Sequence, residues 1–417
     1  MQNGVFPWSD NWWLEGDRAW FCGGAFAALF CVNMNSLECE IVQQIPECDF
    51  INFRQFSYCL RYENNLFCLP TYGKCVWCYD NDRKIWEKIG IPSEDQILIC
   101  LASYEKNNSQ IILRDDEGKF IEIDLEKKEV GAVYRIPLED SMVGGYVLAG
   151  NIIYGIAGNK VYCINRNNSE VITYEIGAAK AGFYTIAFDG KNFWISGFCK
   201  EIYVWNPKQG VIKVITEFPE QFGIYRIDES GNFFKDCSLF ISLTPNAYES
   251  NIAFGRFVEE YGFFSDSVSC GKYMWFTPHR SDGIIYVDKD TYEVYFMEIE
   301  EEKETEESIK SNLIYSKYLI EYIREDRYIG LFSIKNQWIF EIDAVDLRVR
   351  KRNYKLNDQS VLSIAENSGC YNSQWKYREG IKMENMIYTA MLRESNKNGK
   401  KSCRNMGQKI YEILNNV

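Results

Sequence analysis

Short apolar strands followed by polar turns recur along most of the chain. Cys75 to Ile89 reads CVWCYDNDRKIWEKI, Phe120 to Val130 reads FIEIDLEKKEV, and Val161 to Val171 reads VYCINRNNSEV. The alternation of apolar residues is typical of a strand, the Asp or Asn favours a turn, and a β-branched residue begins the return strand. The pattern therefore predicts repeated β-hairpins. It is also present in Leu29 to Val42, Ile202 to Val211, Ile284 to Val294 and Trp338 to Val349.

The polar residues that end these strands are spaced almost regularly. They are Asp80, Asp124, Asn165, Asn206, Asp288 and Asp343, at intervals of 44, 41, 41, 82 and 55 residues. Because 82 is twice 41, we expect one degenerate copy between Asn206 and Asp288. The stretches FGIYRID, CSLFISLTP and SNIAFGRF, between Phe222 and Phe257, supply its strands.

Two more short strands precede each hairpin, most clearly in GGYVLAG, NIIYGIAG, NKVYCIN and EVITYEIG between Gly144 and Gly177. Four strands in roughly 40 to 50 residues are typical of a β-propeller blade. We predict an all-β fold, a β-propeller of eight four-stranded blades over residues 1–356. Seven blades are the alternative, in which the irregular sixth unit is an insertion. The inner strands are expected to start near Trp12, Phe56, Ile97, Gly144, Tyr184, Gly223, Ser267 and Leu319.

The strand pattern stops after Tyr354. Residues 357–417 are predicted to form a partly helical C-terminal extension packed on the propeller. Apolar residues at helical spacing indicate two short amphipathic helices. An acidic insertion after the seventh unit, EIEEEKETEESIKS, is expected to be solvated. The helical positions are Met386, Ile387, Ala390 and Met391, then Met406, Ile410 and Leu414.

The segment CVWCYDNDRKIWEKI resembles the second half of a kelch repeat, where a strand ending in Tyr-Asp leads to a Trp on the outer strand. Trp86 and the doublet Gly23-Gly24 match kelch hallmarks. Most other blades lack both features, and the repeats are shorter than kelch repeats. The chain is similar to bacterial propeller proteins with degenerate kelch- or WD40-like blades. This resemblance implies a fold and no activity, because propellers include binding modules and several enzyme classes.

Composition and charge narrow the range of partners. The net charge is −13 and the pI is about 4.9, which opposes nucleic-acid binding because that binding depends on neutralising phosphates. The one basic cluster, RVRKRNYK from Arg348 to Lys355, is expected to be a solvated edge strand. No signal peptide and no apolar run of membrane-spanning length is present. We therefore expect a cytoplasmic monomer without membrane insertion, whose 15 cysteines are free thiols.

No motif for metal, cofactor or covalent chemistry is recognisable. Cys75 and Cys78 form a CxxC without a second pair, and the chain has one histidine, so we expect no zinc site. Phosphate-binding loops and a G-x-S-x-G elbow are missing, and we predict no cofactor. The catalytic candidates are His279 as a base and Arg280 as a stabiliser of a developing enolate. A polar surface loop explains both residues without any chemistry.

Pro70, Pro245 and Pro278 occupy equivalent loops between the second and third strands of their units, where they stiffen the chain. Such loops share one propeller face with the loops that enter the inner strands, and pre-ordered loops favour recognition. We therefore predict a non-enzymatic module that binds a protein, peptide or glycan through this face. The alternative is a lyase- or hydrolase-like enzyme acting on a carbohydrate or small polar substrate in the central channel. The candidate binding residues are Tyr72, Tyr225, Arg226, Tyr248, Glu249, His279, Arg280 and Asp282, with Gly23-Gly24 at the same rim.

Overall fold

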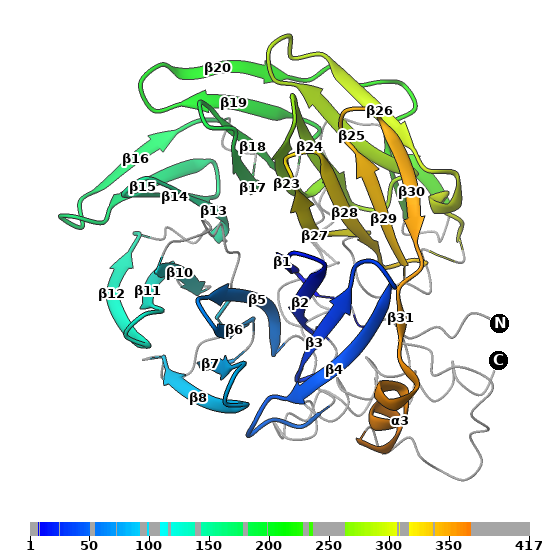
Figure 1. The fold of residues 1–417 in the computed structure, drawn as a ribbon. Helices are drawn as coiled ribbons and strands as arrows, with labels where there is room; N and C mark the ends of the chain where they lie inside the picture. The colour runs from blue at the N-terminus through cyan, green and yellow to red at the C-terminus, as the bar shows by residue number, and fades with distance from the viewer. Residues whose placement is uncertain are drawn as a thin grey trace, which may run out of the picture.

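The computed structural model shows a ring of four-stranded antiparallel sheets around a centre (Figure 1). It has seven such blades, each with its first strand innermost. The described residues are 7, 9–24, 26–50, 55–71, 73–91, 98–99, 109–115, 118–137, 143–177, 182–197, 199–227, 233–236, 263–306, 308, 317–336 and 338–367.

The strands follow the chain order within each blade. Blades one and two comprise β1 (Trp13–Glu15), β2 (Arg18–Cys22), β3 (Ala28–Asn33), β4 (Glu38–Gln44), β5 (Phe56–Tyr62), β6 (Asn65–Pro70), β7 (Cys75–Asp80) and β8 (Ile85–Gly90). Blades three and four comprise β9 (Leu98–Ile99), β10 (Gln110–Asp115), β11 (Lys119–Asp124), β12 (Glu129–Arg135), β13 (Val143–Ala149), β14 (Ile152–Ala157), β15 (Lys160–Asn165) and β16 (Val171–Glu175). Blade five comprises β17 (Phe183–Phe188), β18 (Phe193–Gly197), β19 (Ile202–Asn206) and β20 (Gly210–Ile215). Blades six and seven comprise β23 (Phe264–Cys270), β24 (Tyr273–Pro278), β25 (Gly283–Asp288), β26 (Val294–Glu298), β27 (Tyr318–Arg324), β28 (Tyr328–Ser333), β29 (Trp338–Asp343) and β30 (Arg348–Arg352).

The predicted hairpin turns between the third and fourth strands are confirmed. In blade two, Asp80 Oδ1 accepts hydrogen bonds from the backbone N–H groups of Asp82 and Arg83 at 3.0 and 2.9 Å. The turn ends four residues later, where Lys84 has a φ of +58° and donates its N–H to the Asp80 carbonyl. The other six blades place a positive-φ residue at the same offset, namely Leu37, Lys128, Ser169, Gly210, Tyr292 and Leu347.

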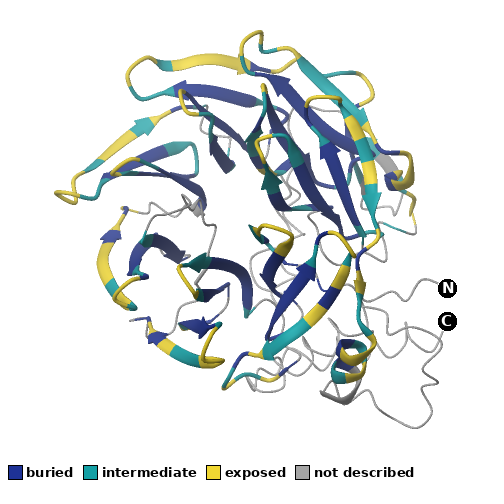
Figure 2. Cartoon of the chain, in the orientation of Figure 1, coloured by how far each residue is buried: buried dark blue, intermediate teal, exposed yellow. Residues whose placement is uncertain are grey.

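Burial decreases from the second and third strands to the outer strand of each blade (Figure 2). Strand β24 is fully buried, whereas β20 has four exposed residues in a row. The two middle strands contact neighbouring blades on both faces, so they are almost entirely apolar. The core is therefore a series of inter-blade layers.

The sixth repeat unit is a two-stranded hairpin in the described part of the chain, formed by β21 (Ile224–Ile227) and β22 (Phe233–Asp236). The inner strands β17 and β23 lie next to each other, and one apolar cluster joins Trp194 of blade five to Phe276 of blade six. No blade stands between them, so the alternative of seven blades is the one observed, and the expectation of eight was wrong. The expected strands CSLFISLTP and SNIAFGRF lie outside the described residues.

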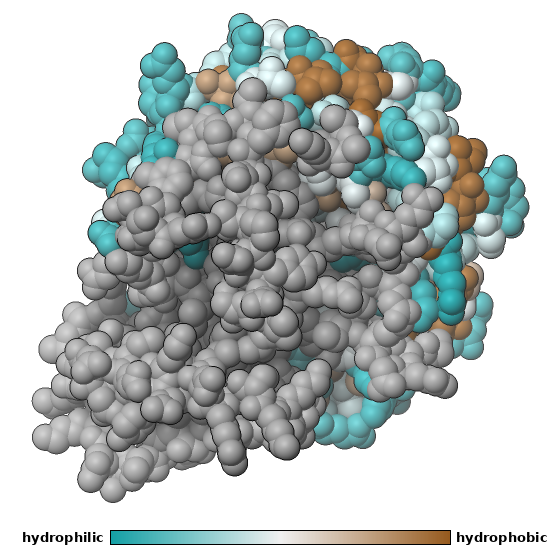
Figure 3. Space-filling model, turned by 180° about the vertical axis from the view of Figure 1, so that it is seen from behind, coloured by the Kyte–Doolittle hydropathy of each residue, from teal (hydrophilic) through white to brown (hydrophobic). Residues whose placement is uncertain are grey.

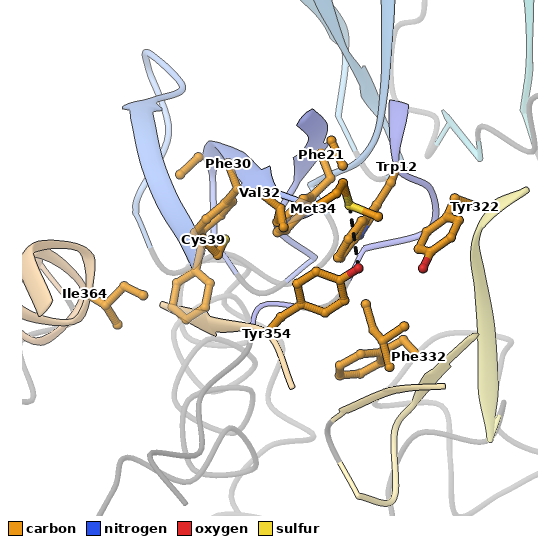
Figure 4. Packing of buried hydrophobic residues seen from close by; sticks show 14 of the residues in the cluster. Trp12, Phe21, Phe30, Val32, Met34, Cys39, Tyr322, Phe332, Tyr354 and Ile364 are labelled. Carbon is orange, nitrogen blue, oxygen red and sulfur yellow. Dashed lines mark hydrogen bonds between the residues drawn. The ribbon is translucent and has the colours of Figure 1, made fainter. Parts of the chain in front are cut away.

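The ring is closed by a segment that follows blade seven. Strand β31 (Lys355–Leu356) pairs in parallel with the outer strand β4, with Leu356 opposite Cys39. The packing between blades one and seven centres on Trp12, which stacks on Phe21 at 5.1 Å and contacts Tyr354 edge-on (Figure 4). Closure therefore combines one added strand with an aromatic core from both ends of the ring.

One helix, α3 (Asp358–Asn367), follows β31. The Ile41 N–H donates to Ser360 Oγ at 2.8 Å, and Ile364 is buried in the cluster of blades one and seven. The two helices predicted around Met386 and Ile410 lie outside the described residues. No helix among those described is long and apolar enough to cross a membrane.

Candidate functional site

The loop between β24 and β25 in blade six lies where three segments meet. The His279 N–H donates to the Phe263 carbonyl at 3.1 Å, and the Tyr225 N–H donates to the Arg280 carbonyl at 2.9 Å. Lys317 Nζ donates to the Ser281 carbonyl. The loop is thus held by the start of its own blade, by the β21–β22 hairpin and by blade seven.

Arg280 has a φ of +34° within this loop. A non-glycine residue in this conformation is strained and persists only when its surroundings fix it. Most other positive-φ residues among those described lie in the turns of the opposite face. The hydrogen bonds around Arg280 supply the restraint, so the loop has one defined shape.

Asp282 connects the loop to the β21–β22 hairpin. Its Oδ2 accepts from the Tyr225 hydroxyl at 2.7 Å and lies 3.4 Å from Lys235 Nζ, and its Oδ1 accepts from the Glu304 N–H at 2.9 Å. Burial opposes ionisation, but these hydrogen bonds and the lysines hold the pKa of Asp282 below its ordinary value. Burial and the Asp282 carboxylate raise the pKa of Tyr225. Asp282 is therefore an ionised anchor for the hairpin.

A buried ammonium group lies beneath this loop. Lys317 has 1% of its side chain exposed, and its Nζ lies 2.8 Å from Glu304 Oε1 and donates to the Glu302 carbonyl. Burial lowers the pKa of Lys317 against the opposing effect of both glutamates. The acidic insertion was expected to be solvated, and this was wrong for Glu302 and Glu304, whose side chains are 0% and 3% exposed.

The inner strands carry a repeated irregularity at the same face. Register shifts lie between Phe56 and Tyr58, between Phe183 and Thr185, and between Phe264 and Asp266. Such β-bulges redirect side chains and are frequent beside functional sites. The bulged residues are Ser57, Tyr184 and Ser265.

Carboxylates lie close to these bulges. The Ser57 hydroxyl donates to Asp10, and the Asp10 N–H donates to the Ser57 carbonyl at 2.9 Å. Desolvation raises the pKa of Asp266 to about 6, and the charge of Asp10 adds to this shift. The Asp266 side chain is exposed to solvent. We call Asp10, Ser57, Tyr184, Ser265 and Asp266 the channel mouth.

The structure brings four of the predicted site residues together. Tyr225, His279, Arg280 and Asp282 belong to the interlocked loop, although His279 and Asp282 are each only 7% exposed. The His279 ring lies 6.4 Å from that of Tyr184. Arg226 lies in β21, and its side chain is outside the described set. Tyr72, Tyr248 and Glu249 lie outside the described residues.

The other loop predictions concern glycine and proline. Pro70 and Pro278 both end the second strand of their blades, opposite Phe56 and Phe264 respectively. Gly23 follows the second strand of blade one, where an added Cβ would lie 2.6 Å from the Phe30 ring. Gly23 therefore allows the close packing of Phe30 in the equivalent loop. Pro245 lies outside the described residues.

The cysteines among the described residues are free thiols. Cys75 and Cys78 both lie in β7, as expected for strand residues. No group of three possible metal ligands occurs within the described ranges. A thiol cluster that the sequence does not indicate is also present: Cys22 contacts Cys59 and Cys68, and burial raises the pKa of Cys22 well above its ordinary value.

The basic cluster forms the outermost strand β30, as predicted for an edge strand. Its side chains have internal partners as well as solvent. Arg350 pairs with the buried Glu341, and Arg352 Nη2 donates to the Met34 carbonyl at 3.0 Å. These arginines hold blade seven together and bridge it to blade one.

Comparison with known proteins supports the fold alone. No protein-family model and no curated protein matches the chain. The computationally designed Ika8 protein superposes with a TM-score of 0.51 at 8% identity, covering 84% of this chain and 89% of that one. The structure of U3-55K superposes with a TM-score of 0.50 at 6% identity, covering 79% and 89%.

Proposed function

We propose that this propeller is a binding module that recognises a protein or peptide through the face formed by the interlocked loop and the channel mouth. A glycan is the other ligand class that such a face accommodates. The proposal rests on one observation above all, the strained and fully restrained backbone of Arg280.

The restraint lowers the entropic cost of binding. Ordering a loop on association costs free energy, so a loop that is already fixed binds more tightly for the same contacts. Here Tyr225, Phe263 and Lys317 hold the backbone on both sides of Arg280. Arginine is also among the residues that most often dominate binding energies at interfaces.

The test is selection from a random phage-displayed peptide library, followed by affinity measurement of the selected peptides. We expect Arg280→Glu to weaken the selected peptides at least tenfold. Lys272→Glu is the matched control, because Lys272 is exposed in the turn at the other end of the same blade. Equal affinity of the peptides for wild type and Arg280→Glu would show that this face does not bind them.

Incubating the same protein with a glycan array tests for carbohydrate binding. Turnover of the arrayed carbohydrates tests the enzyme alternative. Bound glycans that Arg280→Glu releases would support a glycan-binding face. Turnover of an arrayed carbohydrate that is lost in Asp266→Asn would instead favour catalysis in the central channel. Asp266 is the group to test because its pKa of about 6 suits proton transfer near neutral pH.

Four finer predictions accompany this proposal. They are membership of a kelch-like family, a bacterial source, a cytoplasmic location and a monomeric state. Each follows from the sequence patterns described above and stays a prediction.

A further inference from the structure

Strand β20 is an unusually apolar outer edge. It is the outermost strand of blade five, with β19 on one side and no described strand on the other. Val211, Ile212 and Val214 are 39%, 36% and 37% exposed. Brown, hydrophobic side chains appear along the upper rim in Figure 3, on the part of the ring where Figure 1 places β20.

Natural sheets protect their edges with charges, bulges or covering segments because an open edge pairs with other chains. Three other outer strands of this propeller follow that rule, although β8 and β12 each expose one large apolar residue, Ile85 and Val133. Strand β4 is covered by β31, and β30 carries four basic residues in its sequence RVRKR. Strand β16 exposes Ile172, but Glu170 and Glu175 flank it. Strand β20 has one charged residue, Lys213.

Lys208 precedes β20 and Lys213 lies within it, whereas the exposed Glu217 and Glu220 follow its end. Lys208 and Lys213 are exposed, and neither forms an ion pair with a carboxylate in the described part of the chain. The chain as a whole has a net charge of −13. Lys213 is the one charged side chain within this apolar edge, so an acidic residue opposite it in an added strand is favoured.

The molecule itself shows that an outer edge accepts a further strand. Strand β31 adds to β4 in parallel, with Lys355 opposite Glu38. That pairing uses backbone hydrogen bonds and places Leu356 opposite Cys39 and a cation opposite an anion in register. Strand β20 likewise offers backbone groups, apolar side chains and one charged residue, which is the cation Lys213 where β4 has the anion Glu38.

We propose that the outer edge of β20 binds an extended peptide strand of a partner protein, in which apolar residues alternate with acidic ones. Backbone pairing supplies the affinity, and an acidic residue opposite Lys213 sets the preference. This site lies on the outer rim and is independent of the proposed loop face. A second copy of this chain fits less well, because a six-residue strand pair buries far less than the roughly 1,200 Å² of stable interfaces.

The experiment measures fluorescence anisotropy of a labelled Val-Glu-Val-Glu-Val-Glu-Val peptide with the full-length protein. Ile212→Lys is expected to weaken binding at least tenfold. Ile172→Lys is the matched control on the neighbouring blade and is expected to leave binding unchanged. N-methylation of four consecutive peptide amides is expected to abolish binding, because it blocks backbone pairing on both edges of the peptide.

A charge reversal checks the role of Lys213. Lys213→Glu is expected to weaken the acidic peptide several-fold and to strengthen a Val-Lys-Val-Lys-Val-Lys-Val peptide. Equal binding of the acidic peptide to wild type and Ile212→Lys would overturn the proposal. Sedimentation velocity without peptide tests for self-association. A dimer that dissociates in the Ile212→Lys variant would also overturn the proposal, because the edge would then be an interface between two copies of this chain.

Discussion

At the scale of single residues, Lys317 decides the shape of the loop face. In place of water, the partners of its buried ammonium group are the Ser281 carbonyl, the Glu302 carbonyl and the Glu304 carboxylate. A buried charge is tolerated only when its partners are complete. Ser281 belongs to the β24–β25 loop and both glutamates belong to the segment after β26, so Lys317 joins these two segments to the start of blade seven.

We therefore expect Lys317→Met to reduce the free energy of unfolding by about 3–5 kcal/mol, because it leaves buried carboxylates without their cation. Urea denaturation measures this loss. Lys303→Met is the control, since Lys303 pairs with Glu298 and Glu300 at the surface and such pairs contribute about 0–1 kcal/mol. A loss under about 1 kcal/mol for Lys317→Met would contradict the buried cluster.

The sequence could not indicate this cluster, for a physical reason. A run of glutamates is solvated unless a cation is buried beside it, and Lys317 lies 13 residues after Glu304 with no pattern linking the two. The hairpin turns are different, because Asp80 and its equivalents form their hydrogen bonds with residues only two and three positions away. Hydrogen bonds between residues close in sequence could therefore be predicted, whereas contacts between residues brought together only by the fold could not.

At the scale of elements, the strands were predictable because each blade repeats the same periodicity. The expected inner strand near Phe56 begins at Phe56, and the one near Tyr184 begins at Phe183. Contacts between blades were not accessible in this way. Cys59 and Cys68 pair across β5 and β6 of blade two, and Cys22 of β2 reaches them only because blades one and two pack together.

The closing elements β31 and α3 lie where the strand pattern fades, so their role is visible only in the structure. Ile364 of α3 is 3% exposed and packs in the core of blades one and seven. If α3 is an integral part of ring closure, Ile364→Ala will reduce the free energy of unfolding by about 2–4 kcal/mol. Leu362→Ala changes a residue of the same helix that is 41% exposed and is expected to cost under about 0.5 kcal/mol. Equal small losses would show that α3 is dispensable for closure.

At the scale of the whole molecule, spacing alone left two blade counts open. An interval of 82 residues accommodates either a degenerate blade or an elaborated connection. The direct contact of β17 with β23 decides for the connection. The inner strands of blades four and five, β13 and β17, also lie close together, and this approach depends on Gly144. A Cβ atom added at Gly144 would lie 2.9 Å from the Phe183 carbonyl oxygen.

A ring of seven blades implies that the sixth unit can be removed without opening the propeller. The two ends of this unit already lie together, because Phe222 and Phe263 have ring centroids 6.1 Å apart and Ile224 shares their cluster. We expect replacement of residues 226–261 by Gly-Ser-Gly to leave one cooperative thermal transition and an unchanged far-ultraviolet strand signal. The melting temperature is expected to fall by a few degrees, since Lys235 and its contact with Asp282 are lost. Loss of the cooperative transition would mean that the sixth unit is needed for the stability of the ring, as a blade is. If the cooperative transition is retained, the packing between β17 and β23 is sufficient to link blades five and six.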